Sequence, residues 1–139
     1  MFSLLLVTGG CAIQRTSMIT SRPPQSVMLM TSGYCDCRKC TGWKRNWKYQ
    51  TVYAYGHLKG KPKEVGITSD GTKARKGIIA ADTDIYPFGT TFYIPGYGYG
   101  EVHDRGGLIK GKYRIDLFFK THKEALNWGK KTLKVDYWK

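Results

Sequence analysis

The sequence has few acidic residues, few histidines and no long apolar run, and each shortage narrows what the protein can be. Its 139 residues hold 10 Asp and Glu against 23 Lys and Arg, and only 3 His. The longest apolar run near the amino end is too short to span a bilayer. No period of about 20 to 50 residues recurs, which excludes a repeat architecture.

The shortage of acidic residues leaves a formal net charge of +13, which should attract polyanions. Nucleic acid and the anionic bacterial envelope are both candidates, and a merely solvated surface is the alternative. The basic residues are scattered, and neither a recognition helix nor an RNA-binding aromatic signature is present. We therefore expect no nucleic-acid partner.

Residues 1–11 form a short apolar run that ends in two glycines and Cys11. This pattern resembles the end of a bacterial lipoprotein signal, with Cys11 as the lipid attachment site. No basic residue precedes the run, and Thr8 stands where such signals usually carry Leu, so a frayed apolar terminus is the alternative. Residues 12–27 lack an apolar period and contain Pro23-Pro24, which is typical of a linker. We expect one domain over residues 28–139.

Short strand-like runs outnumber helical ones, so the sequence predicts a mainly β fold. Alternating bulky residues predict one long strand over 46–55, and a basic, Gly-rich loop should follow over 58–77. Thr121 and Glu124 match a capping box, and Gly129 suits the end of that short helix. The other expected strands are 27–31, 78–81, 90–94, 100–104, 113–119 and 132–138.

Cys35, Cys37 and Cys40 lie within six residues of one another. They are a weak candidate for a metal site, with a His such as His57 as the fourth ligand. One disulfide with one free thiol, or three reduced thiols, are the alternatives. His122 falls in the first turn of the expected helix, where we expect it to be exposed.

Half of the ten acidic residues fall between positions 82 and 116. Asp116 interrupts an apolar strand, a position that disfavours Asp. If its side chain is buried, desolvation and neighbouring carboxylates should raise its pKa, as a general acid requires. An outward-facing Asp paired with Arg114 or Lys110 is the alternative. Glu101 would reach the site of Asp116 if its strand pairs with the strand expected over 113–119. His103 should face away from Asp104, because adjacent strand residues alternate.

Six motifs occur in a fixed order along the second half of the chain: IIAAD (78–82), PFGT (87–90), YIPGYG (93–98), DRGGLIKG (104–111), RID (114–116) and EALNWG (124–129). Together they resemble the three-aspartate (3D) domain, which is similar to the catalytic core of the membrane-bound lytic transglycosylase A family. The resemblance covers about residues 28–138 and is strongest over 78–138.

The resemblance implies a six-stranded double-psi β-barrel and maps the three name-giving aspartates onto Asp82, Asp104 and Asp116. It implies that Asp116 is the single acid/base, that Asp104 orients or tunes it, and that Asp82 lines the same site. The reaction would cleave peptidoglycan glycan strands between MurNAc and GlcNAc with a 1,6-anhydro product and no cofactor.

Gly106, Gly107 and Lys110 in the glycine-rich loop, together with Tyr97, are the expected sugar-binding residues, and Tyr99 and Phe88 are further aromatic candidates. Two other functions fit the same barrel: a hydrolytic glycosidase that uses Asp82 or Asp104 as base, and a wall-binding module without catalysis. We expect a monomer in the bacterial envelope, at the outer membrane or in the periplasm, held by its lipid.

Overall fold

The computed structural model describes residues 22–139. The expected signal segment with Cys11 and most of the expected linker lie outside these residues. Within the described part, no helix is long and apolar enough to cross a membrane.

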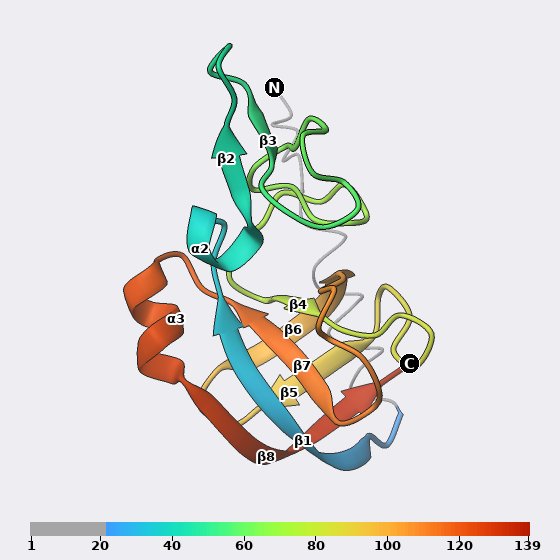
Figure 1. The fold of residues 1–139 in the computed structure, drawn as a ribbon. Helices are drawn as coiled ribbons and strands as arrows, with labels where there is room; N and C mark the ends of the chain where they lie inside the picture. The colour runs from blue at the N-terminus through green and yellow to red at the C-terminus, as the bar shows by residue number, and fades with distance from the viewer. Residues whose placement is uncertain (1–21) are drawn as a thin grey trace, which may run out of the picture.

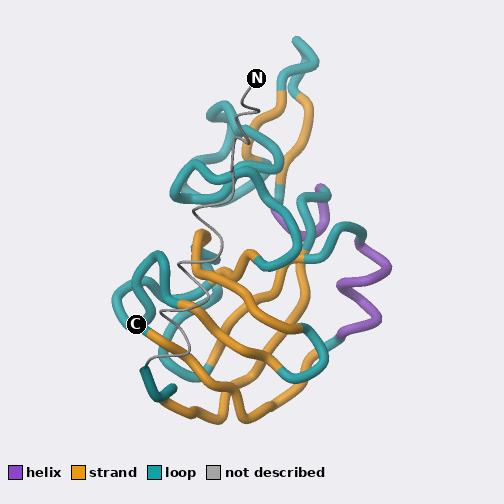
Figure 2. Tube along the Cα trace, turned by 180° about the vertical axis from the view of Figure 1, so that it is seen from behind, coloured by secondary structure: helices purple, strands orange, loops and turns teal. Residues whose placement is uncertain are grey.

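Six strands close into a barrel, in the spatial order β1-β7-β4-β6-β5-β8 (Figures 1 and 2). The predicted mainly β, six-stranded fold is therefore confirmed, while its double-psi crossings stay a prediction. The strands are β1 (Gln25–Tyr34), β4 (Ile78–Ala80), β5 (Thr91–Ile94), β6 (Gly98–Asp104), β7 (Arg114–Phe118) and β8 (Lys130–Trp138).

Strand β1 holds the two ends of the domain together. It pairs in parallel with β7 and antiparallel with β8, where Gln25 lies opposite Tyr137 and Ser32 opposite Lys130. Because β8 supplies a partner as far back as Gln25, the barrel begins three residues before the boundary expected at residue 28.

The barrel interior is filled by alternate residues of the strands, as period two requires. Leu29, Ile79, Phe92, Ile115 and Leu117 are at most 1% exposed and share one cluster. A second cluster consists of Tyr34 and of three sequence neighbours of Ile79 and Leu117, namely Ile78, Ala80 and Phe118. Since strand residues alternate, this second cluster lies on the outer face of the barrel.

Helix α3 (His122–Trp128) forms where the sequence predicts it, because its first turn has the predicted capping box. Glu124 N donates to Thr121 Oγ1 at 3.2 Å, and Thr121 N donates to Glu124 Oε2 at 2.9 Å. The helix packs closely on β1, since a Cβ added at Gly33 would lie 2.7 Å from the Ala125 carbonyl oxygen. Only glycine allows this approach.

Residues 35–77 form a small lobe above one end of the barrel (Figure 1). It contains α2 (Arg38–Thr41), β2 (Trp43–Arg45) and β3 (Thr51–Tyr53), and otherwise loops, as predicted for residues 58–77. Its Cys40 and Ala74 pack on the outer cluster of the barrel. The lobe is therefore seated on the barrel face that carries Tyr34 and Ala80.

The single strand predicted over residues 46–55 is wrong. β2 and β3 pair as a hairpin, and its connecting turn includes Tyr49 at a φ of 59°. Asn46 builds the turn, because its side-chain oxygen accepts from the backbone N of Lys48 and of Gln50. Asn is suited to such turns, whereas the aromatic alternation only mimics a strand. Trp47 is 84% exposed at this tip.

Candidate functional site

Two of the three aspartates meet on the outer face of the barrel. Ala80 of β4 pairs with Asp116 of β7 on one side and with Asp104 of β6 on the other. On β1, Ser32 pairs with Asp116. Residues paired across neighbouring strands point to the same face, so these side chains form one row beneath the small lobe.

A β-bulge places Asp104 in this row. The partner of β4 jumps from Val102 at Ile79 to Asp104 at Ala80, which leaves His103 as the extra residue. Val102 faces the core, so regular alternation would also turn Asp104 inward. Bulges commonly redirect a side chain in this way next to functional sites. The expectation that His103 and Asp104 face opposite ways is therefore wrong.

Asp116 is half-buried, and burial raises the pKa of its carboxyl above the ordinary value. The hydrogen bond from Ser32 Oγ to Asp116 Oδ1 and the charges of Arg114 and Lys130 act in the opposite direction, while Asp104 raises the pKa further. Among the described residues, no hydrogen bond reaches Asp116 Oδ2. The structure thus has a carboxyl group that is fixed through one oxygen, with a raised affinity for its proton.

Asp104 is held much more firmly. Its Oδ2 accepts from Tyr34 Oη at 2.9 Å, and its Oδ1 accepts from Ser69 Oγ at 2.7 Å, Ser69 N at 3.1 Å and Arg105 N at 2.9 Å. Burial, and then the charge of Asp104, raise the pKa of Tyr34, so that its hydroxyl stays a donor. These four donors hold both carboxyl oxygens of Asp104 in place beside Asp116.

Asp82 lies apart from this pair. Its Oδ2 accepts from Gly111 N at 2.9 Å, and its Oδ1 accepts from Asp84 N at 3.3 Å. The hydrogen bond from Gly111 is the main cause of a lowered pKa of Asp82, and Lys110 contributes. In the described residues Asp82 makes no hydrogen bond to Asp104 or Asp116. Its visible role is to anchor the loop that follows β6.

That loop, residues 105–113, contains three of the expected sugar-binding residues. Gly106 must be glycine, since a Cβ there would lie 2.4 Å from Ile109 Cγ1, whereas a Cβ at Gly107 would meet nothing within 4 Å. Lys110 is exposed. Gly107 and Lys110 therefore leave open backbone and an exposed cation at the surface of the loop.

The expectation that Tyr97 stacks on a sugar is wrong. Tyr97 is 7% exposed and belongs to the barrel core. Its hydroxyl donates to the Phe118 carbonyl at 2.8 Å and accepts from Gly77 N at 2.9 Å. The two other aromatic candidates keep accessible surface, since Tyr99 is 58% exposed and Phe88 is 36% exposed. The guanidinium of Arg105 lies over the ring of Phe88.

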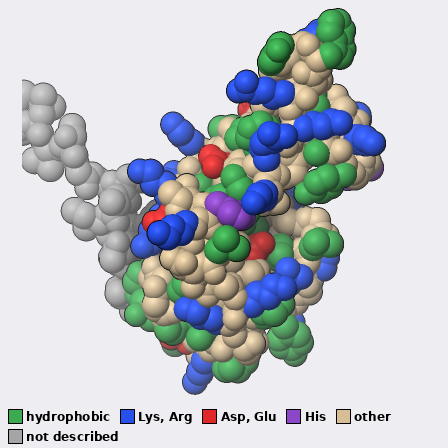
Figure 3. Space-filling model, turned by 60° about the vertical axis from the view of Figure 1, so that its left-hand side comes forward, with side chains coloured by type: hydrophobic (Ala, Val, Ile, Leu, Met, Phe, Trp, Pro, Cys, Tyr) green, Lys and Arg blue, Asp and Glu red, His purple; other side chains and the backbone are tan. Residues whose placement is uncertain are grey.

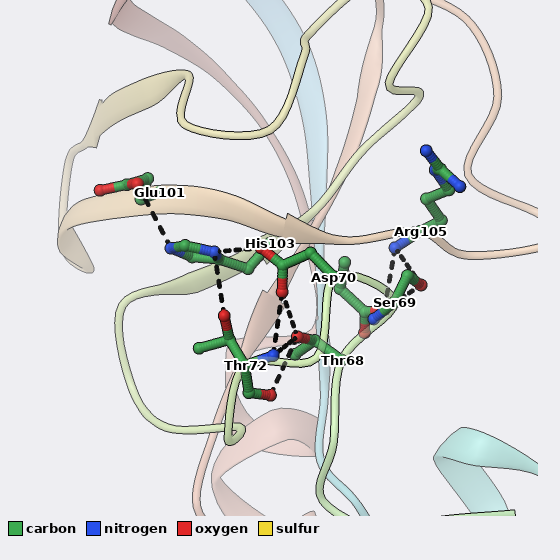
Figure 4. A network of polar contacts seen from close by, with 8 residues as sticks. Thr68, Ser69, Asp70, Thr72, Glu101, His103 and Arg105 are labelled. Atoms are coloured by element: carbon green, nitrogen blue, oxygen red, sulfur yellow. Dashed lines mark hydrogen bonds and ion pairs between the residues drawn. The ribbon is translucent and has the colours of Figure 1, made fainter.

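A polar network continues from Asp104 along β6 (Figure 4). His103 Nδ1 lies 2.6 Å from Asp70 Oδ2, and its Nε2 lies 3.3 Å from Glu101 Oε1. Burial raises the pKa of Asp70, but the hydrogen bonds from His103, Thr68 and Thr72 outweigh it and hold this pKa well below the ordinary value. The network ties the 68–72 loop of the small lobe to β6 and holds Ser69 against Asp104.

A cavity of about 660 Å³ opens beside this network. Figure 3 shows a face on which histidine, basic, acidic and hydrophobic side chains lie together. The rings of Tyr99 and Trp138, which lie 6.2 Å apart, line the cavity. Its lining also includes the basic residues Arg22, Arg75, Lys76 and Lys139, together with Glu101 and His103. The cavity shares β6 with the aspartate pair, although neither Asp104 nor Asp116 lines it.

The cysteines form a separate cluster, and its histidine is not the predicted one. Cys35, Cys37 and Cys40 gather around His122 of α3, with their ligand atoms all within 4.8 Å of one another. His57 is exposed in the small lobe. The suggestion of His57 as a fourth ligand, and of an exposed His122, is therefore wrong, because the end of β7 brings α3 beside the end of β1.

Sequence reasoning missed Ser32, Tyr34 and Ser69, the side chains that hold the aspartate pair. Ser32 and Tyr34 lie 84 and 70 residues from the aspartates that they contact. A weak signal existed, because Ser32 and Tyr34 occupy alternate positions of one strand and therefore share a face.

The second half of the chain matches a known protein family. Residues 77–139 match the family model of the 3D domain. The chain is 39% identical over 92 residues to the cell wall-binding protein YocH of Bacillus subtilis (strain 168), covering 63% of this chain and 32% of that protein. It is 41% identical over 74 residues to the putative cell wall shaping protein YabE of the same organism, covering 50% and 18% respectively.

The chain thus spans about a third or less of the length of these curated relatives. Among solved structures it is similar to the crystal structure of MltA from E. coli, with 22% sequence identity and a TM-score of 0.44. That similarity covers 57% of this chain and 29% of the other.

Proposed function

Because residues 77–139 are a 3D domain, we propose that this protein acts on the bacterial cell wall as a peptidoglycan lytic transglycosylase. Asp116 is the acid and base, Asp104 is the fixed charge beside it, and Asp82 supports the loop that meets the substrate. The relatives named for cell-wall binding and cell-wall shaping support a place in the envelope. A lipid on Cys11 would hold the protein at a membrane surface.

The reaction follows from one carboxyl group. Protonated Asp116 gives its proton to the glycosidic oxygen between MurNAc and GlcNAc, and the bond from that oxygen to C1 of MurNAc breaks. An oxocarbenium-like centre develops at C1, and the ionised carboxylates of Asp116 and Asp104 stabilise it. Asp116 then takes the proton of the MurNAc C6 hydroxyl, whose oxygen attacks C1. The products are a 1,6-anhydro sugar and a free GlcNAc hydroxyl, and Asp116 is again protonated.

The observation that carries this proposal is the contrast between the two aspartates. Asp104 accepts four hydrogen bonds, whereas Asp116 accepts one, from Ser32, and burial raises its pKa. A carboxyl group whose pKa is raised by burial, beside a second carboxyl group that four donors hold in place, suits the proton transfer that glycosidic cleavage needs.

The surface around the pair fits an anionic glycan. The chain carries a net charge of +13, and the cavity beside β6 adds four basic side chains to the rings of Tyr99 and Trp138. Sugar rings pack on aromatic faces, and carboxylates of the wall polymer pair with Lys and Arg. We infer that the strand lies across the outer face of the barrel, from this cavity to Asp116.

A wall-binding module without catalysis is the second candidate. One relative of this chain is named a cell wall-binding protein, and this name favours a binding module. In that case the cavity and the basic surface would be the functional site, and Asp116 would be dispensable for binding.

The test is mass spectrometry of purified peptidoglycan after incubation with the full-length protein. The Asp116→Asn protein is compared with Asp84→Asn, which changes an exposed carboxylate next to Asp82. We expect anhydromuropeptides from the native and Asp84→Asn proteins and none from Asp116→Asn. Reducing-end products would instead show hydrolysis. No soluble product from any of them, with all three still bound to the wall, would establish the binding module.

A further inference from the structure

Three cysteine sulfurs and one imidazole nitrogen converge where the small lobe meets the barrel, outside the aspartate site. His122 Nδ1 lies 3.4 Å from Cys40 Sγ, 3.5 Å from Cys37 Sγ and 3.9 Å from Cys35 Sγ. The sulfurs of Cys35 and Cys40 are 3.7 Å apart. No part of the proposed sugar chemistry uses these four groups.

Their spacing matches the edges of a zinc tetrahedron. With Zn–S bonds of about 2.3 Å and a Zn–N bond of about 2.05 Å, tetrahedral angles place two sulfurs about 3.8 Å apart and a sulfur and a nitrogen about 3.6 Å apart. The observed distance between the sulfurs of Cys35 and Cys40, 3.7 Å, is close to the first value. The three observed sulfur–nitrogen distances, 3.4 to 3.9 Å, lie on both sides of the second.

The backbone around the cysteines is already arranged to present them. Cys37 precedes the single turn of α2, and its carbonyl accepts from Thr41 N at 3.0 Å and from Thr41 Oγ1 at 3.0 Å. Gly42 ends the turn in the left-handed conformation at a φ of 56°. Trp43 Nε1 donates to the Asp36 carbonyl at 2.9 Å. Cys37 and Cys40 therefore lie three residues apart on one fixed turn, a spacing that zinc sites use.

A disulfide explains the cluster less well. It requires sulfurs about 2.05 Å apart and uses only two of the three. Among the described residues the three cysteines are free. A disulfide between Cys35 and Cys40 would leave Cys37 and His122 facing each other without a role, whereas a metal uses all four groups.

The charge of the surroundings also favours a bound metal. Three thiolates, a neutral imidazole and a dication together carry one negative charge, in a chain whose net charge is +13. Arg38 and Lys39 lie within the turn itself. A single negative centre is therefore placed among compensating cations.

We propose that Cys35, Cys37, Cys40 and His122 bind one structural Zn²⁺. Four protein ligands close the coordination sphere, which is typical of structural rather than catalytic zinc. The metal fastens the small lobe to α3 and to the end of β1. Cys35 follows Tyr34, whose hydroxyl holds Asp104, so the zinc also fixes the base of the aspartate site.

The first experiment measures metal content in the full-length protein purified under reducing conditions from cells grown with added zinc. We expect one zinc per chain, lost to background in Cys37→Ser and in His122→Ala. His57→Ala is the matched control and should keep its zinc. A native protein without zinc, or zinc that survives His122→Ala and is lost in His57→Ala, would overturn the proposal.

A second measurement covers the case in which a variant fails to fold. Cobalt(II) is added to the metal-free native protein, and the visible spectrum is recorded. We expect the intense bands of tetrahedral cobalt with thiolate charge transfer, and slower alkylation of the three cysteines once zinc is added. Weak octahedral bands with unchanged alkylation, or an intact mass that shows a native disulfide, would refute a metal site. Both readouts are independent of any activity on the cell wall.

Discussion

Replacing Tyr34 with Phe removes one hydroxyl group and tests whether the aspartate pair is held as described. The Tyr34 hydroxyl is buried and donates to Asp104 Oδ2 at 2.9 Å. A hydrogen bond to a charged group contributes about 1.5–3 kcal/mol. The ring itself stays in place, because its edge contact with Phe118, at 5.4 Å between centroids, does not involve the hydroxyl.

We expect Tyr34→Phe to lower the free energy of unfolding by that amount. About 1 kcal/mol moves the Tm of a domain of this size by roughly 3–4 °C, so the Tm should fall by about 5–12 °C. In an Asp104→Asn background the same change should cost about half as much, because a hydrogen bond to a neutral acceptor is roughly half as strong. Thermal and urea unfolding of the four proteins provides the double-mutant cycle.

Tyr86→Phe is the matched control. Its hydroxyl donates to the neutral carbonyl of Lys112 at 2.8 Å, so its loss should cost only about 0.5–1.5 kcal/mol in either background. An equal cost of Tyr34→Phe with Asp or Asn at position 104 would refute the reasoning, since the charge of Asp104 would then contribute nothing.

Three further predictions concern the same barrel. The folded-state pKa of Asp116 is raised, so the stability that its protonation contributes is present at acid pH and lost as the pH rises through that pKa. Asp116→Asn should therefore be more stable than the native protein at pH 7, and the difference should vanish in acid. Urea unfolding at both pH values measures this difference. Gly100→Ala should lower the free energy of unfolding by about 1–3 kcal/mol, because its Cβ would lie 2.7 Å from Ile79 Cδ1. Gly107→Ala should change the free energy of unfolding by no more than about 0.5 kcal/mol and lower only the yield of glycan product. Thr121→Ala breaks the capping box of α3 and should cost about 1 kcal/mol in thermal unfolding; an unchanged Tm would contradict a stabilising role of the cap.

Local patterns predicted most of the barrel. The apolar runs around Ile79 and Leu117 became strands, and the capping box at Thr121 marked the start of α3. These signals depend on residues that are close together in the chain, so a single sequence is enough to recognise them. The strand predicted over residues 46–55 was wrong for an equally local reason, because the turn built by Asn46 outweighed the aromatic alternation around it.

The arrangement of the candidate site could not be predicted, because it depends on register between distant strands. The resemblance named Asp104 and Asp116, but the bulge at His103 and the pairing of both with Ala80 are properties of the closed sheet. The misassignment of His57 has the same cause, since His122 lies 85 residues from Cys37 along the chain. Tyr97 was misjudged because aromatic residues fill cores as readily as they line sugar sites.

The pairing of β1 with β7 and β8 joins segments that lie far apart in the chain. Gln25 finds its partner Tyr137, and Ser32 finds Asp116, only after nearly the whole domain has been synthesised. Contacts of such long sequence separation slow folding, because loop entropy is lost before the contacts form. The nascent chain must therefore leave the ribosome with its first strand unpaired, and a chain truncated before β8 cannot close the barrel. In such a chain β1 and β5 would each lack the neighbour that β8 provides, so the sheet would keep two open edges.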